Sequence, residues 1–205
     1  MKWIVAGAAM FASAEAAHWA VIMAGSNTYG NYRHQADACH AYQIAKKNGI
    51  PESNIIMLAY DDIAGDDRNP FPGKMFNKPT AAGVPGVDVY EGCNINYRGK
   101  DVTAENFLKV LSGDTSASGP VLKSTAEDHV FVYYADHGGT GILGVPTGAK
   151  GGYIHAADIN AAIETLQKKG GYKELLFYLE ACESGSIFNR LLKAPNAKAT
   201  SLETS

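Results

Sequence analysis

The sequence of 205 residues has little charge, few cysteines and no apolar run long enough to cross a bilayer. Charged residues make up 19% of the chain and the formal net charge is -3, so the basic surplus of a nucleic-acid-binding surface is missing. No stretch reaches the roughly 20 apolar residues of a membrane helix. We therefore expect neither a nucleic-acid partner nor a membrane span, and the apolar fraction of 46% predicts one domain with a substantial core.

Cysteine is scarce, with Cys39, Cys93 and Cys182 far apart in the chain. Three cysteines are too few and too scattered for a disulfide framework. We therefore expect that disulfides do not staple this fold and that at least one thiol stays free. A free thiol is either buried and inert or kept for its reactivity.

The first residues, MKWIVAGAAMFASAEA, have the pattern of a secretory leader. One Lys precedes an apolar run from Trp3 to Phe11, and Ala14 and Ala16 are spaced like a signal-peptidase site. We expect residues 1–16 to be a signal peptide and the mature chain to enter the secretory pathway. The alternative is a core strand at the amino terminus.

Apolar runs alternate with helical periodicity along the rest of the chain. Helices are predicted at 35–48, 103–113, 156–171 and, briefly, 186–192. Strands are predicted at 18–26, 54–60, 128–139 and 173–182, and all of them except 54–60 are predicted to be buried. Residues 61–99 are rich in Gly, Pro, Asn and Asp and predict an extended surface segment. The alternation predicts a three-layer α/β domain with a mainly parallel sheet and a ligand site at the carboxyl ends of its strands.

Two predicted strands end in residues that could form a catalytic pair. His137 and Gly138 follow one strand and Cys182 ends another, and strand ends at one edge of a parallel sheet are neighbours. Taken singly, each residue has a structural explanation, a buried Cys or an incidental turn His. Together they favour a nucleophile with its base, in which protonated His137 holds Cys182 as a thiolate. The backbone N–H groups of Gly138 and Cys182 could then form an oxyanion hole.

Several long strings resemble the legumains, asparaginyl endopeptidases of the caspase-like clan of cysteine peptidases. In order along the chain, from about His18 to Leu192, they are AGSNTYGNYRHQADACHAYQIAKKNGIP, YDDIA, VTAENFLKVLSGD, YADHGGTGILG and YLEACESGSIF. The resemblance implies a caspase-like fold and cleavage after asparagine, or after aspartate at lower pH. It also implies peptide or protein substrates with Asn, cystatin-type inhibitors, no cofactor, and a lysosomal, vacuolar or secreted enzyme.

The resemblance also assigns roles to single residues. Cys182 becomes the nucleophile, His137 the general base and acid, and Asn31 the residue that orients the histidine. Arg33 and Glu180 correspond to residues that line the pocket for the asparagine side chain, with His34 beside them. A carboxamide has an acceptor oxygen and a donor NH₂ group, which a guanidinium and a carboxylate complement.

Other interpretations of these residues stay open or fail on context. An ordinary surface ion pair between Arg33 and Glu180 is the alternative to a specificity pocket. The run GTGILG, residues 139–144, has the spacing of a dinucleotide-binding fingerprint, but Pro146 and later glycines prevent the helix that this fingerprint must open. We therefore reject an NAD-dependent oxidoreductase.

No metal site is expected from the sequence. The acidic residues of the middle segment lack the spacing of an EF-hand loop, which favours a solvated acidic turn; they are Asp61, Asp62, Asp66 and Asp67. His34 and His40 are six residues apart and would not face one metal on a helix.

The resemblance to legumains gives out before the chain ends. Legumains continue with another strand, more of the specificity pocket, the rest of the catalytic domain and an inhibitory propeptide. We expect residues 17–192 to be an incomplete legumain-like peptidase domain, truncated at the carboxyl end, and 193–205 to be a frayed or divergent tail. Two other functions stay open: a catalytically silent product that binds peptides or partners, and an enzyme like the glycosylphosphatidylinositol transamidase.

Overall fold

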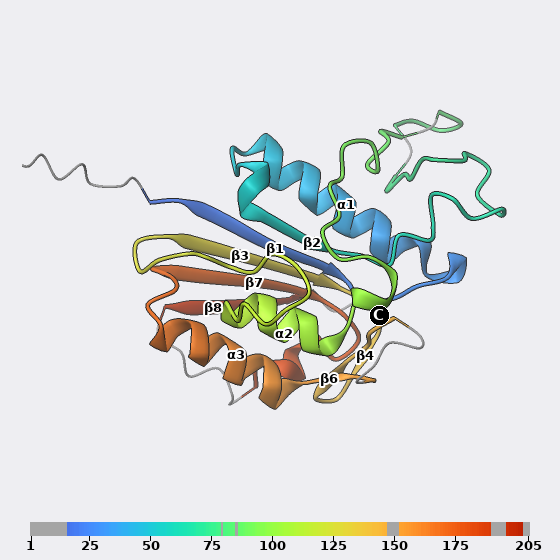
Figure 1. Ribbon diagram of the computed structural model, residues 1–205. Coiled ribbons are helices and arrows are strands. Elements are labelled where there is room, and N and C mark those ends of the chain that lie inside the picture. The colour runs from blue at the N-terminus through green and yellow to red at the C-terminus, as the bar shows by residue number, and fades with distance from the viewer. Residues whose placement is uncertain (1–15, 79, 85, 147–151, 190–195, 203–205) are drawn as a thin grey trace, which may run out of the picture.

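The computed structural model describes residues 16–78, 80–84, 86–146, 152–189 and 196–202, so the predicted signal peptide lies almost wholly outside the described part. Five parallel strands form the central sheet, in the order β2-β1-β3-β7-β8. They are β1 (His18–Ala24), β2 (Ile55–Leu58), β3 (His129–Ala135), β7 (Glu174–Glu180) and β8 (Ala197–Leu202). Helix α1 lies on one face of the sheet, and α2 and α3 lie on the other (Figure 1). The predicted three-layer α/β fold with a parallel sheet is confirmed.

The three long helices match the predictions to within a few residues. They are α1 (Tyr32–Lys47), α2 (Ala104–Ser112) and α3 (Ala156–Lys168). Thr103 caps α2, because its side chain accepts the Asn106 N–H at 3.1 Å, and Gly113 ends the helix with φ +66°. Helix α1 begins three residues before its predicted start, since its first turn is polar and carries no apolar period.

Short elements complete the described fold. Three two-residue strands form an antiparallel sheet of their own, and four short 3-10 helices lie in the connections. The strands are β4 (Gly138–Gly139), β5 (Ile142–Leu143) and β6 (Ile154–His155); the 3-10 helices are η1 (Tyr29–Asn31), η2 (Glu52–Asn54), η3 (Gly99–Asp101) and η4 (Ser184–Ile187). The run GTGILG therefore forms a hairpin and opens no helix, which agrees with the rejection of a dinucleotide site. No helix of the described residues is long and apolar enough to cross a membrane.

Alternate side chains of the central strands enter two separate cores. Val21 and Val132 pack in the core on the side of α2 and α3, whereas Ala20 and Ile22 pack in the core on the side of α1. All four are fully buried, as expected for strands covered on both faces. This rigid centre carries the loops at the carboxyl ends of its strands.

Strand β7 is not buried on both faces, and that prediction was wrong. Leu175, Phe177 and Leu179 are buried, but Leu176 and Tyr178 on the opposite face are 36% and 37% exposed. The reason is tertiary: α1 packs mainly on β1 and β3, so it does not cover this part of the sheet. An apolar run alone cannot show which strand a helix reaches.

The expected frayed tail also needs correction, because residues 197–202 form β8 and pair with β7. Ala197 and Ala199 are partly buried against the core, while Lys198 and Thr200 on the alternate positions are exposed. The buried members are small, so the alternation typical of a half-buried strand was too weak to recognise.

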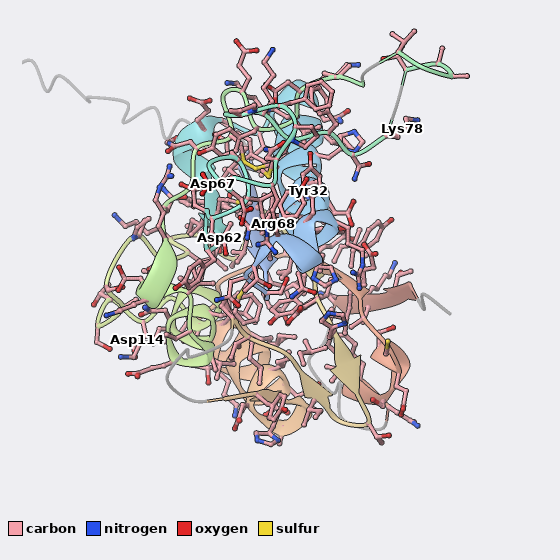
Figure 2. All side chains as sticks on the ribbon, turned by 90° about the vertical axis from the view of Figure 1, so that its right-hand side faces the viewer. Tyr32, Asp62, Asp67, Arg68, Lys78 and Asp114 are labelled. Carbon is pink, nitrogen blue, oxygen red and sulfur yellow. A yellow bond between two sulfur atoms is a disulfide. The ribbon has the colours of Figure 1, made fainter. Side chains whose placement is uncertain are left out.

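The segment from residue 61 to 99 crosses over α1, and a disulfide fixes it there. Cys39 of α1 bonds to Cys93, with a Cα–Cα distance of 5.6 Å, and Figure 2 shows the bond in yellow. The expectation that disulfides do not staple the fold was therefore wrong. The segment folds back over the helix, and counting cysteines cannot reveal such a long-range approach. Cys182 remains a free thiol, as expected because an odd number of cysteines cannot all pair within one chain.

Loss of this disulfide is expected to destabilise the protein strongly. The bond closes a loop with a sequence separation of 54 residues, and restricting a loop of that length in the unfolded chain is worth about 4 kcal/mol. We expect the double variant Cys39→Ala/Cys93→Ala to lose most of that free energy of unfolding in a urea titration. Cys182→Ala, which removes an exposed thiol, should leave the urea midpoint unchanged. Equal midpoints for the double variant and the parent would contradict this stabilising role.

Candidate active site

The segments that follow β3 and β7 lie side by side. Ala135 pairs with Glu180 at the end of the sheet, and the Asp136 N–H donates to the Glu180 carbonyl at 3.1 Å. Beyond these residues, a Cβ placed on Gly138 would stand 2.6 Å from the Cys182 carbonyl oxygen. The structure therefore brings together the two backbone segments that were predicted to meet at the sheet edge.

Cys182 lies on a tight turn that opens directly to solvent. It is exposed, and Glu183 after it has φ +53° before η4 begins at Ser184. The β4–β5 hairpin holds this turn, because the Thr140 hydroxyl bonds to the Glu183 carboxylate and the Gly141 N–H donates to Ser186 Oγ at 2.9 Å. Glu183 thus binds the hairpin, which explains a carboxylate next to the sulfur.

A hydrogen bond with Asn31 determines which ring nitrogen of His137 carries a proton. His137 Nε2 lies 2.8 Å from Asn31 Oδ1, and Asn31 Nδ2 donates to the Asn27 carbonyl at 2.9 Å. The second bond fixes the amide with its oxygen toward His137, so Nε2 must carry a proton. In the neutral imidazole the lone pair is then on Nδ1, the atom that could accept a proton.

The turn that carries Asn31 is fastened by Asp62, a residue that we expected only in a solvated acidic turn. Thr28, just before η1, has φ +72°, and its N–H donates to Asp62 Oδ2 at 2.6 Å. The other oxygen of Asp62 accepts from Gln35 Nε2 at 2.7 Å. Figure 2, which looks onto the carboxyl ends of the strands, shows Asp62 beside Arg68 in the middle of this face. In the sequence, the only indication of this role for Asp62 was its position in a pair of adjacent acidic residues directly after a predicted strand.

Two more acidic residues of that segment, Asp61 and Asp66, also have protein partners. Asp61 accepts from the Tyr90 hydroxyl at 2.8 Å and pairs with Arg98. Asp66 pairs with Arg68 at 2.8 Å, and hydrogen bonds from this guanidinium lower the pKa of Asp66 to about 2. The rejection of a calcium loop agrees with these contacts, but a merely solvated turn was too simple an expectation.

His34 lies behind His137, where a substrate could touch little of it. It is 2% exposed, and its ring meets the His137 ring edge to face with centroids 4.9 Å apart. His34 Nδ1 lies 2.7 Å from Ser26 Oγ and 3.3 Å from Asp136 Oδ1. In this structure the side chain packs against the His137 ring, and its place beside the substrate pocket stays a prediction.

Arg33 and Glu180 do not form the ion pair that was the alternative to a pocket, since neither has an ion-pair partner among the described residues. Arg33 is exposed in the first turn of α1, and Asp37 lies one turn later on the same helical face. Asp37 in turn is close enough to Glu180 for electrostatic repulsion. Burial, and then this repulsion, raises the pKa of the Asp37 carboxyl.

Glu180 itself accepts a hydrogen bond from the Tyr133 hydroxyl at 2.9 Å. Burial, and then the nearby carboxylates, raises the pKa of Tyr133, so this hydroxyl stays a donor across the physiological range. This hydrogen bond holds one carboxylate oxygen of Glu180 in place at the end of β7. A carboxylate held in this way, facing the first turns of α1, could accept from the NH₂ group of a carboxamide.

Comparison with known proteins gives the same family along most of the chain. The model of the peptidase C13 family matches residues 18–203. The chain is 51% identical to legumain from Mus musculus over 188 residues, which is 89% of this chain and 41% of that protein. It is 54% identical to the vacuolar-processing enzyme beta-isozyme from Arabidopsis thaliana over 181 residues, which is 85% of this chain and 35% of that protein. The chain thus spans about two fifths or less of the length of these relatives.

Proposed function

Because this chain belongs to the peptidase C13 family, we propose that it carries the catalytic residues of a cysteine endopeptidase that cleaves peptide bonds after asparagine. The observation that carries the proposal is the meeting of the exposed Cys182 turn with the His137-Gly138 segment at the sheet edge. A nucleophile and a base on adjacent strand ends are what acyl transfer requires. We propose this peptidase chemistry for the enzyme whose catalytic residues these are.

In the proposed reaction, Nδ1 of His137 takes the thiol proton and the Cys182 sulfur attacks the substrate carbonyl carbon. The oxyanion that forms accepts hydrogen bonds from the backbone N–H groups of Cys182 and Gly138, each worth on the order of 10²–10³ in rate. His137 then gives the proton to the leaving amine, and water hydrolyses the thioester. Asn31 contributes by holding Nε2–H, so that Nδ1 is the nitrogen left to accept the proton.

The proposed specificity rests on two charges that are not neutralised by each other. The Arg33 guanidinium would donate to the carboxamide oxygen, and Glu180 would accept from its NH₂ group. A site that reads a substrate by such hydrogen bonds can discriminate by roughly 10⁴–10⁵ against side chains that leave the groups unpaired. His34 does not touch the substrate in this scheme; it positions the His137 ring.

We further propose that the enzyme works in the secretory pathway, in a lysosome or vacuole or after export, and that cystatin-type proteins inhibit it. The leader-like residues 1–16 and a disulfide at Cys39–Cys93 both fit an oxidising compartment. A relative from Vicia sativa, 51% identical over 182 residues, is named a vacuolar-processing enzyme.

The test is hydrolysis of an Ala-Ala-Asn fluorogenic peptide, with Ala-Ala-Gln as the matched control that adds one methylene to the same amide. We expect turnover of the first and at least about 10-fold less of the second, since an extra methylene in a fitted pocket is worth about 1–3 kcal/mol. Binding of both peptides without turnover would instead support the silent peptide-binding alternative. Transfer to an added amine at the expense of hydrolysis would favour the transamidase-like alternative.

Cleavage after aspartate is expected to improve as the pH falls. At pH 7 the substrate carboxylate would be repelled by Glu180 and by the nearby Asp37, whereas the protonated acid has the shape of asparagine. The raised pKa of Asp37 means that this residue loses its charge earlier on acidification than an ordinary Asp, which lowers the repulsion further. We expect the ratio of kcat/KM for Asp over Asn peptides to rise steadily from pH 7 to pH 4. A ratio that is constant or falls over this range would show that Glu180 does not face the substrate side chain.

A further inference from the structure

Three side chains behind the proposed catalytic base form a cluster of metal-ligand type. His34, Asp136 and His137 each present one ligand atom, and these atoms all lie within 4.8 Å of one another. His34 and Asp136 are buried, and His137 is exposed. A tetrahedral zinc ion with bonds of roughly 2 Å needs ligand atoms about 3.3 Å apart. Closing the gap from 4.8 Å to that separation requires a shift of the His137 side chain, which is exposed and has one nitrogen held by Asn31.

The carboxylate of Asp136 gives an independent sign that a positive group belongs here. The residue is 5% exposed, and its Oδ1 accepts no hydrogen bond among the described residues, although His34 Nδ1 lies 3.3 Å from it and would pair with it when that imidazole is protonated. Its Oδ2 is packed so closely against the backbone that a Cβ on Gly25 or Gly144 would come within 2.6 Å or 2.3 Å of it. The carboxylate therefore cannot turn away, and a buried oxygen without a partner is costly unless a cation or donor completes it.

Both imidazoles also have the outer contacts typical of metal ligands. Asn31 Oδ1 accepts from His137 Nε2, and Ser26 Oγ lies 2.7 Å from His34 Nδ1. Asn31 holds Nε2 of His137 and leaves Nδ1 without a partner among the described residues, whereas His34 Nδ1 faces both Ser26 Oγ and Asp136 Oδ1, at 2.7 Å and 3.3 Å. Such outer contacts fix the orientation of a ligating ring. Two imidazoles and one carboxylate suit zinc, whereas calcium and magnesium prefer oxygen ligands alone.

We propose that His34, Asp136 and His137 bind a zinc ion or a similar divalent transition metal, with the fourth position open to solvent. Metal binding does not depend on the proposed function, but its consequence does: the ion occupies the His137 nitrogen that would take the thiol proton. Bound metal therefore inhibits the peptidase, and a chelator restores activity. The three ligands are contributed by α1 and by the segment after β3, so no local spacing in the sequence could show the site.

Cobalt absorption tests binding without any assay of activity. The full chain is titrated with Co²⁺, whose visible bands report tetrahedral coordination, and Zn²⁺ is then added in competition. We expect one ion per chain and at least 10-fold weaker binding in His34→Gln and in Asp136→Asn. His40→Gln is the matched control, because His40 lies on the same helix and its Nδ1 contacts Asn77 Oδ1 at 3.1 Å, outside the cluster. Loss of binding in the control as well, or no saturable binding, would overturn the proposal.

A second measurement does not depend on whether the variants fold. Anomalous scattering from crystals grown with Zn²⁺ locates the ion directly. We expect it within coordination distance of all three side chains. An ion held by Cys182 and His137 without His34 would overturn the site, as would an ion elsewhere or none, and each of these results leaves the peptidase proposal intact.

Discussion

Cys182→Ala is expected to abolish hydrolysis of the Ala-Ala-Asn peptide, by more than about 10⁴-fold in kcat, because no other free thiol among the described residues can replace the missing nucleophile. The thiol is exposed and unbonded, so its removal should not change the fold. The urea midpoint and the far-UV circular dichroism of the variant should therefore equal those of the parent. Loss of activity with unchanged stability separates a chemical role from a structural one.

The free thiol also allows a direct test of its partner. Because the other two cysteines are in a disulfide, iodoacetamide should label Cys182 alone. We expect His137→Gln to slow this labelling at pH 6, since the imidazolium that favours the thiolate is lost. Residual peptide hydrolysis in Cys182→Ala above the level of a buffer blank would disprove the assignment of the nucleophile. Full activity loss with unchanged labelling in His137→Gln would assign His137 to proton transfer alone.

The sequence predicted that the segments carrying His137 and Cys182 lie side by side, because this follows from a general rule of parallel sheets. Once both segments are read as consecutive strands of such a sheet, their carboxyl ends must lie on one edge. The lateral order was also favourable, since β3 and β7 turned out to be direct neighbours. Asn31, by contrast, was assigned only by resemblance, because no periodicity relates a residue before α1 to a histidine 106 positions later.

Contacts made through the backbone were beyond sequence-based prediction. Asp62 binds the N–H of Thr28, a group that every residue except proline has, so the side chain of Thr28 gives no hint of it. The burial of His34 was not predicted for a related reason. Its burial depends on how α1 tilts against the end of β3, and a polar residue in a polar first turn suggests exposure.

Gly138→Ala is expected to lower kcat strongly, on the order of 10²-fold, because the added methyl group meets the backbone of the nucleophile itself. Its Cβ would stand 2.6 Å from the Cys182 carbonyl oxygen and 3.0 Å from the Ala181 Cβ. Neither atom belongs to a flexible side chain, so the His137 and Cys182 segments must move apart. A displacement of about 1 Å at reacting groups can cost about 10²-fold in rate.

Gly139→Ala is the matched control for this substitution, since it adds the same methyl group to the next residue of β4. Its Cβ would meet only the Ile142 side chain, at 3.6 Å and 3.7 Å, which are ordinary contact distances. We expect this variant to keep kcat/KM within about 3-fold of the parent, because neither catalytic segment has to shift. If the two alanines reduced kcat equally, the loss would come from stiffening of the hairpin. A selective loss in Gly138→Ala would instead show that catalysis requires the close approach of the two strand ends.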